Sequence, residues 1–225
     1  MADDPALSAS TAAALAEFLA ERAAAAERAD DGCPLAEDWS KSQFWYTADT
    51  AAAAADAVVG AVGKGGRGPS APRVACVACP SLFHALRTRH GDAVDAILLE
   101  HDDRLAELGP YAAYDYNEPL ALPAGWAASA DAVVADPPYL AASCLAKTAE
   151  SVHALKKGDD AVVLLLTGAV MRRDARRLLG VTPAAFRPEH RSKLGNEFMA
   201  ATNSEAVAEA LGGWDDAWRR ELDEE

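Results

Sequence analysis

Short apolar runs recur along the chain, and longer segments of mixed polarity separate them. These runs are apolar at nearly every position rather than at every second one, which is typical of parallel strands covered on both faces. The pattern therefore predicts an α/β fold with a mostly parallel sheet. The predicted buried strands are residues 73–78, 93–100, 111–116, 130–135 and 161–166.

The segments between the runs have the spacing of amphipathic helices. Two later stretches, residues 184–187 and 197–202, would complete a doubly wound sheet of seven strands. Thr47 and Asp49 are the candidate caps of the first helix inside the domain. The predicted helices are residues 51–62, 82–90, 101–108, 142–155 and 169–179.

The length of 225 residues fits one domain with short appendages. We divide the chain into an N-terminal helix and linker (1–38), a catalytic domain (39–205) and an acidic C-terminal tail (206–225). Alanine-rich residues 8–28 predict the N-terminal helical extension. We expect the tail to be a frayed appendage, and the alternative is that its tryptophans dock it on the domain.

No feature of the sequence predicts secretion or a membrane span. The chain begins with an acidic segment and has no apolar stretch behind it. The alanine-rich residues 51–62 are too few to cross a bilayer and contain Asp56. Cys76 and Cys79 have the spacing of a metal or redox site, but no second such pair accompanies them. A cytoplasmic protein with reduced thiols is the expectation.

Candidate chemistry lies where the predicted strands end, because ligands of open α/β sheets bind at the carboxyl ends of the strands. Glu100 ends the second strand and is placed to bind ribose hydroxyls, with Asp102 as the second choice. Asp115, after the third strand, could bind an adenine amine. Alternatively, Glu100 and Asp102 are only the acidic start of a helix, and Asp115 is an ordinary loop residue.

The fourth strand ends in Asp136-Pro137-Pro138-Tyr139. The two prolines stiffen the turn, so that the Asp136 carboxylate and the Pro137 carbonyl can face the same incoming amine. The ring of Tyr139 would then form a wall that packs on a planar base or attracts a cation. The alternative is a turn with a structural role alone.

These motifs together resemble a known family. The Asp-Pro-Pro-Tyr turn is similar to that of class I amino-methyltransferases, and within them the chain resembles the elongation factor 1-alpha lysine methyltransferases. Members of this family were earlier described as N6-adenine DNA methyltransferases. The similarity extends over residues 39–203, through Ser42–Thr47, Tyr114–Asn117, Ala135–Tyr139, Thr167–Gly168 and Asn196–Phe198.

The resemblance implies a Rossmann-like fold, the cofactor S-adenosyl-L-methionine and a lysine acceptor on elongation factor 1-alpha. It implies catalytic roles for Asp136, Pro137 and Tyr139 without a metal. Phe44 and Tyr46 would cover the methionine end of the cofactor. The usual glycine-rich loop after the first strand is replaced here by a segment with Pro80 and Ser81, which we assign to the cofactor site with Glu100, Asp102 and Asp115.

Charge bears on the choice of acceptor. The formal net charge of -14 disfavours nucleic acid, whose binding depends on many contacts between cationic side chains and phosphates. A basic ridge at residues 172–177 is interrupted by Asp174 and is typical of a solvated helical face. An N6-adenine methyltransferase acting on DNA or RNA and a non-catalytic binding module remain the alternatives.

Overall fold

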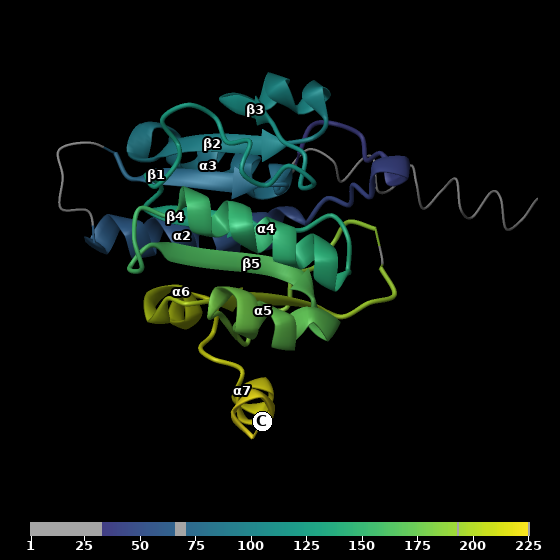
Figure 1. Ribbon diagram of the computed structural model, residues 1–225, viewed down its shortest axis with the longest axis vertical. Coiled ribbons are helices and arrows are strands. Elements are labelled where there is room, and N and C mark those ends of the chain that lie inside the picture. Colours follow the sequence, from purple (N-terminus) through teal and green to yellow (C-terminus); the bar gives the residue numbers. More distant parts are fainter. Residues whose placement is uncertain (1–32, 66–70, 193, 225) are drawn as a thin grey trace, which may run out of the picture.

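The computed structural model describes residues 33–65, 71–192 and 194–224, so the predicted helix at residues 8–28 lies outside the described residues. A seven-stranded sheet has the order β3-β2-β1-β4-β5-β7-β6 (Figure 1). Neighbouring strands are parallel, except that β7 is antiparallel to β5 and β6. The predicted doubly wound, mostly parallel sheet is confirmed. The strands are β1 (Arg73–Val77), β2 (Asp95–Glu100), β3 (Tyr111–Ala113), β4 (Ala132–Ala135), β5 (Val162–Gly168), β6 (Thr182–Pro183) and β7 (Phe198–Thr202).

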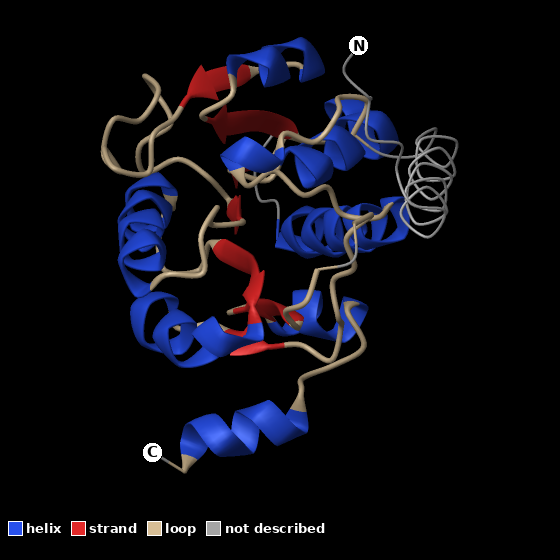
Figure 2. Cartoon of the chain, turned by 90° about the vertical axis from the view of Figure 1, so that its right-hand side faces the viewer, coloured by secondary structure: helices blue, strands red, loops and turns tan. Residues whose placement is uncertain are grey.

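Helices cover both faces of the sheet (Figure 2). Alternate side chains of β1 point to opposite faces, so Val74 and Cys76 pack in one core while Ala75 and Val77 pack in the other. This burial on both faces explains the continuous apolar runs in the sequence. The helices are α2 (Ala48–Gly65), α3 (Pro80–His90), α4 (Ala142–Leu155), α5 (Arg172–Leu179), α6 (Glu205–Ala210) and α7 (Asp216–Asp223).

Most predicted helices are present, with differences in type. The helix predicted at residues 142–155 has those bounds, whereas residues 103–108 form a 3-10 helix, η4. Thr47 caps α2, because its hydroxyl accepts the Thr50 amide at 3.3 Å. No helix among the described residues is long and apolar enough to cross a membrane.

The strand predicted at residues 184–187 is wrong in its position, since β6 is Thr182–Pro183. Its place is set by pairing with β7, where Pro183 lies opposite Ala201. The chain leaves the sheet after this pairing, and the Ala185 amide donates to Gly213 instead. The position of this edge strand depends on tertiary contacts that an apolar run does not reveal.

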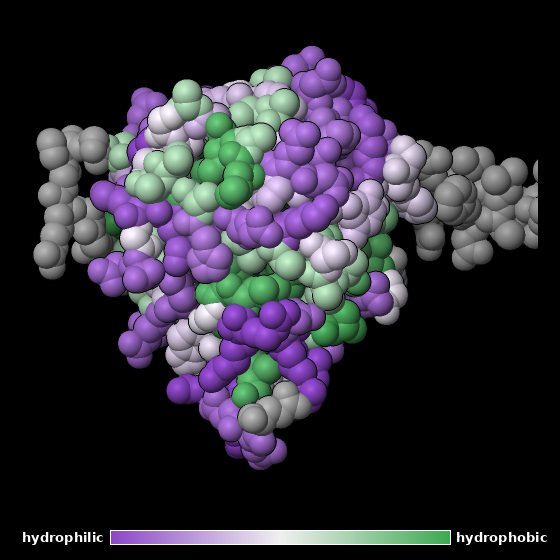
Figure 3. Space-filling view, viewed as in Figure 1, coloured by the Kyte–Doolittle hydropathy of each residue, from purple (hydrophilic) through white to green (hydrophobic). Residues whose placement is uncertain are grey.

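The expectation of a frayed C-terminal tail is also wrong, and the docked alternative describes the structure. The Arg187 guanidinium lies 4.0 Å from the centre of the Trp218 ring, and Arg176 binds Asp223 at 2.6 Å. Arg172 forms a further ion pair with Glu221. Helix α7 therefore packs beside α5 at the end of the molecule where the space-filling view is largely hydrophilic (Figures 1 and 3).

Candidate active site

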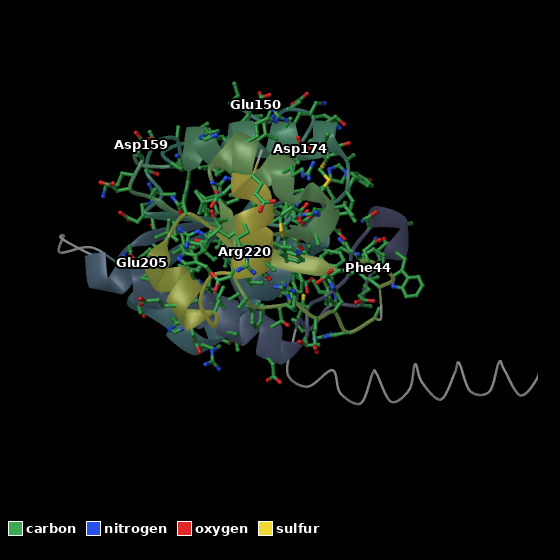
Figure 4. The ribbon with its side chains drawn as sticks, turned by 90° about the horizontal axis from the view of Figure 1, so that it is seen from below. Phe44, Glu150, Asp159, Asp174, Glu205 and Arg220 are labelled. Atoms are coloured by element: carbon green, nitrogen blue, oxygen red, sulfur yellow. The ribbon has the colours of Figure 1, made fainter. Side chains whose placement is uncertain are left out.

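A cavity of about 730 Å³ opens at the carboxyl ends of the parallel strands. Phe44 lies at this end of the molecule, opposite Asp159 and Glu205 (Figure 4). Every site residue predicted from the sequence lines this one cavity, although the residues come from five separate segments. They are Phe44, Tyr46, Pro80, Ser81, Glu100, Asp102, Asp115, Asp136, Pro137 and Tyr139.

Asp136 follows β4 directly and closes the ladder to β1, because its amide donates to the Val77 carbonyl at 3.0 Å. The residue is half-buried and lines the cavity. Desolvation, together with the nearby charge of Glu100, raises the pKa of Asp136 to about 8. Tyr139, two residues after Pro137, is 46% exposed at the cavity mouth. The turn therefore presents an isolated carboxyl inside and an aromatic ring outside.

Glu100 ends β2 and is buried. Its Oε1 accepts the amides of His101 at 2.8 Å and Asp102 at 3.4 Å. Burial raises the pKa of Glu100, and these two amide donors act in the opposite direction. The two amides fix the carboxylate at the cavity wall. Because both donate to Oε1, the second oxygen keeps its capacity to accept hydrogen bonds from a ligand.

Asp102 is also buried, but its carboxylate is already bound by protein groups. Arg104 donates to it at 2.5 Å, Gln43 at 2.9 Å, and Lys41 lies 3.2 Å away. The Arg104 guanidinium is the main cause of a pKa well below the usual aspartate range. The Asp102 carboxylate therefore has less capacity than that of Glu100 to accept hydrogen bonds from a ligand, and it ties residues 41–43 to the end of β2.

The segment before α2 lines the cavity with residues 40–46, which we call the lid. The Tyr46 amide donates to the Ser81 hydroxyl at 3.3 Å, which joins the lid to the start of α3. Phe44 lines the cavity, and its ring packs 6.0 Å from that of Trp39. Trp45 has its indole N–H on the Leu35 carbonyl at 2.6 Å and belongs to the core.

The turn between β1 and α3 reaches the cavity without a glycine. Ala78 has a φ of 53°, a left-handed conformation that few residues other than glycine adopt. Pro80 stands in the first turn of α3, where its fixed φ suits the helix and its lack of an N–H costs nothing. Ala78 thus makes the turn for which related folds use glycine, and Ser81 is placed on the cavity wall.

Asp115 is exposed at the cavity rim, where its Oδ1 accepts the Asn117 amide at 2.8 Å. Tyr116 lines the cavity beside it and packs against Tyr139 with ring centres 5.9 Å apart. Lys147 donates to the Asn117 side chain at 2.7 Å. The segment after β3 therefore joins the predicted adenine side of the cavity to the ring of Tyr139.

Sequence reasoning missed His190, which lines the cavity from the segment before β7. Its ring packs 4.3 Å from those of both Tyr46 and Phe198. Burial lowers the pKa of His190 to about 4, so the imidazole is neutral near pH 7. A single histidine in a polar stretch has no periodic signal, although the nearby Asn196–Phe198 belonged to the motifs of the resemblance.

Comparisons with known proteins show the family of this chain. Residues 37–206 match a family described as "Probable N6-adenine methyltransferase". EEF1A lysine methyltransferase 1 of Mus musculus is 43% identical, covering 89% of this chain and 92% of the mouse protein. The human protein of that name is 41% identical with the same coverage, and protein-lysine N-methyltransferase M142.8 of Caenorhabditis elegans is 39% identical, covering 91% and 96%. The chain belongs to the EEF1A lysine methyltransferase 1 family.

Proposed function

We propose that this chain transfers a methyl group from S-adenosyl-L-methionine to a lysine side chain of elongation factor 1-alpha in the cytoplasm. The observation that carries the proposal is the Asp136-Pro137 turn, which faces the same cavity as Glu100. Membership of a family whose relatives are named EEF1A lysine methyltransferases supports the protein acceptor. The name of the matching family model supports one competing acceptor, an adenine of DNA or RNA.

The residues of the cavity fit the proposed cofactor. Glu100 offers a fixed carboxylate for the two ribose hydroxyls, and Asp115 offers one for the adenine amine. Pro80 and Ser81 lie at the start of α3 on the same wall, while Phe44 and Tyr46 cover the cavity from the lid. When bound, S-adenosyl-L-methionine supplies an electrophilic methyl group on a sulfonium.

Asp136 and Pro137 would orient the acceptor. Once Asp136 has lost its proton, its carboxylate and the Pro137 carbonyl each accept one N–H of a neutral amine, which leaves the nitrogen lone pair free for in-line attack. A lysine has a usual pKa of about 10.4, so removing its proton at neutral pH costs roughly 4 kcal/mol. The proton leaves to solvent in this scheme. Tyr139 at the mouth would pack along the incoming side chain and attract its charge.

A labelling experiment tests the acceptor class. The protein is incubated with radiolabelled S-adenosyl-L-methionine and a cell lysate, with and without nuclease, and the labelled species are identified by mass spectrometry. We expect nuclease-resistant label on a lysine of elongation factor 1-alpha. Label on adenine that nuclease removes would favour the nucleic-acid enzyme, and a failure to bind the cofactor would favour a non-catalytic module.

A further inference from the structure

Tyr46 has a buried hydroxyl without a partner at the candidate active site. The residue is 2% exposed, yet its hydroxyl oxygen has no hydrogen-bond partner among the described residues. A buried polar group that lacks a partner destabilises the fold, because it has lost the hydrogen bonds that water would give it. Because Tyr46 lines the cavity, its hydroxyl is expected to find a partner among the groups of that cavity.

The rest of Tyr46 is held firmly in place. Its amide binds the Ser81 hydroxyl, its backbone forms an antiparallel bridge with His190, and the two rings pack 4.3 Å apart. The ring therefore cannot turn away to find water or another acceptor. The position of the hydroxyl is fixed by three segments that are distant in sequence: the lid, the start of α3 and the segment before β7.

The group that faces this hydroxyl is the Asp136 carboxyl. Both residues line the cavity. Burial is the main cause of the raised pKa of Tyr46, and the Asp136 carboxyl raises it further, while the hydroxyl lowers the pKa of Asp136 against the effect of burial. The other titratable groups around Asp136 are Glu100 at the end of β2 and the Cys79 thiol at the end of β1. Of these neighbours, a neutral tyrosine is the one suited to donate a hydrogen bond to a carboxylate.

We propose that Tyr46 is a positioning residue that acts through Asp136. Once the Asp136 carboxyl loses its proton, the Tyr46 hydroxyl donates to one of its oxygens and leaves the other for the acceptor nitrogen. Because Tyr46 itself is held, the carboxyl makes the adjustment that completes this bond. This inference rests on the proposed function, but the coupling between the two side chains can be measured without any substrate.

The first test is a carboxyl titration by ¹³C NMR on the full-length protein without ligand, with Asp136 assigned through Asp136→Asn. Removal of the donor in Tyr46→Phe is expected to raise the pKa of Asp136 by about one pH unit, since a carboxylate that loses a hydrogen bond is less favoured. Tyr114→Phe is the matched control. It removes a hydroxyl from the same cavity wall, but that hydroxyl binds Ser151. An equal pKa of Asp136 in the two variants would overturn the proposal.

A reciprocal measurement keeps the proposal testable if Tyr46→Phe does not fold. In Asp136→Asn the negative charge is removed, so the pKa of Tyr46 is expected to fall when its ring carbon shifts are followed with pH. A Tyr46 titration that Asp136→Asn leaves unchanged would contradict the coupling.

Activity supplies an independent readout. In Tyr46→Phe we expect kcat on elongation factor 1-alpha to fall at saturating cofactor and the rising part of its pH profile to move to higher pH. An unshifted pH profile would count against Tyr46. If the NMR coupling is present but the wild type methylates no lysine, the proposed function is wrong. The interaction between Tyr46 and Asp136 would then stand, but not its role in orienting a lysine.

Discussion

The ends of β2 and β4 each bring a carboxyl to the same cavity, but the protein groups around the two carboxyls differ. Glu100 at the end of β2 receives two backbone amides on one oxygen. Asp136 at the end of β4 has no backbone donor on its carboxyl among the described residues, and the side-chain donor beside it is the Tyr46 hydroxyl, which has no other partner there. Backbone amides therefore satisfy part of the hydrogen-bonding capacity of Glu100, whereas no backbone amide of the described residues does so for Asp136.

This difference suggests a division of labour. A carboxylate fixed by backbone donors suits the binding of neutral hydroxyls, which needs a permanent charge in a permanent position. A desolvated carboxyl with a raised pKa suits an amine, because the pKa values of the two groups are brought closer together than those of an ordinary aspartate and lysine. Binding energy would thus come from the end of β2, and orientation for transfer from the end of β4.

The largest expected effect is on transfer when Asp136 is removed. Asp136→Ala is expected to reduce the single-turnover rate by on the order of 100-fold or more, since the amine loses its main orienting contact. The cofactor Kd, measured by calorimetry, should stay near that of the wild type. Turnover close to wild type would remove Asp136 from the mechanism.

The next effect is on cofactor binding at the end of β2. Glu100→Ala is expected to weaken the affinity for S-adenosyl-L-methionine by about 10- to 100-fold, as for hydrogen bonds to a charged group of about 1.5–3 kcal/mol. At saturating cofactor the transfer rate should recover. Asp103→Ala removes an exposed carboxylate that does not line the cavity and serves as the control. A Kd that does not change would transfer the role to Asp102 or elsewhere.

Asp136→Asn is expected to lower activity but to raise the stability of the fold. The folded pKa of Asp136, about 8, lies above the unfolded value of about 3.9, so ionisation destabilises the fold increasingly as pH rises between the two. Asp136→Asn removes this penalty. Its melting temperature is expected to exceed that of the wild type by several degrees at pH 8, at about 2–4 °C per kcal/mol, and by less at pH 5. A difference that is independent of pH would contradict this account.

The smallest effect is expected at Asp102, which holds the lid. Its pKa is lowered by Arg104, so the stability it contributes is present above the unfolded pKa of about 3.9 and is lost as pH falls toward the folded value. Asp102→Asn should weaken cofactor affinity only a few-fold at neutral pH, because its contacts reach the lid and not the cofactor directly. A loss as large as that of Glu100→Ala would show that Asp102 binds the cofactor itself.

Much of this arrangement could be predicted from the sequence, because strand burial and strand order leave local signals. The run Ala132–Ala135 is apolar at every position, and this identified the strand that delivers Asp136. The rule that ligands bind at the carboxyl ends of parallel strands then brought Glu100, Asp115 and Asp136 to one cavity. The family resemblance added Phe44 and Tyr46, whose place before β1 has no meaning in a local pattern.

Other features depend on contacts between distant segments. His190 reaches the cavity because the chain near it pairs with the lid, and the Thr47 amide donates to Glu189 at 2.9 Å. The docking of α7 through Trp218 and Arg187 likewise joins segments that are separate in sequence. The sequence alone could not show which of Glu100 and Asp102 can accept hydrogen bonds from a ligand. The partners of Asp102 include Lys41 and Gln43, which lie far from it in sequence.

The central claim is that a lysine nitrogen meets the methyl donor beside Asp136. Single-turnover transfer to purified elongation factor 1-alpha, measured from pH 7 to 9 with mass-spectrometric mapping of the product, tests it most directly. We predict methyl on a lysine ε-nitrogen and a loss of this transfer in Asp136→Asn. The rate should rise with pH by about tenfold per unit as the neutral fraction of lysine grows, and more steeply below about pH 8, where Asp136 also ionises. Methyl recovered on adenine and not on lysine, with a rate that is flat over this pH range, would contradict the account.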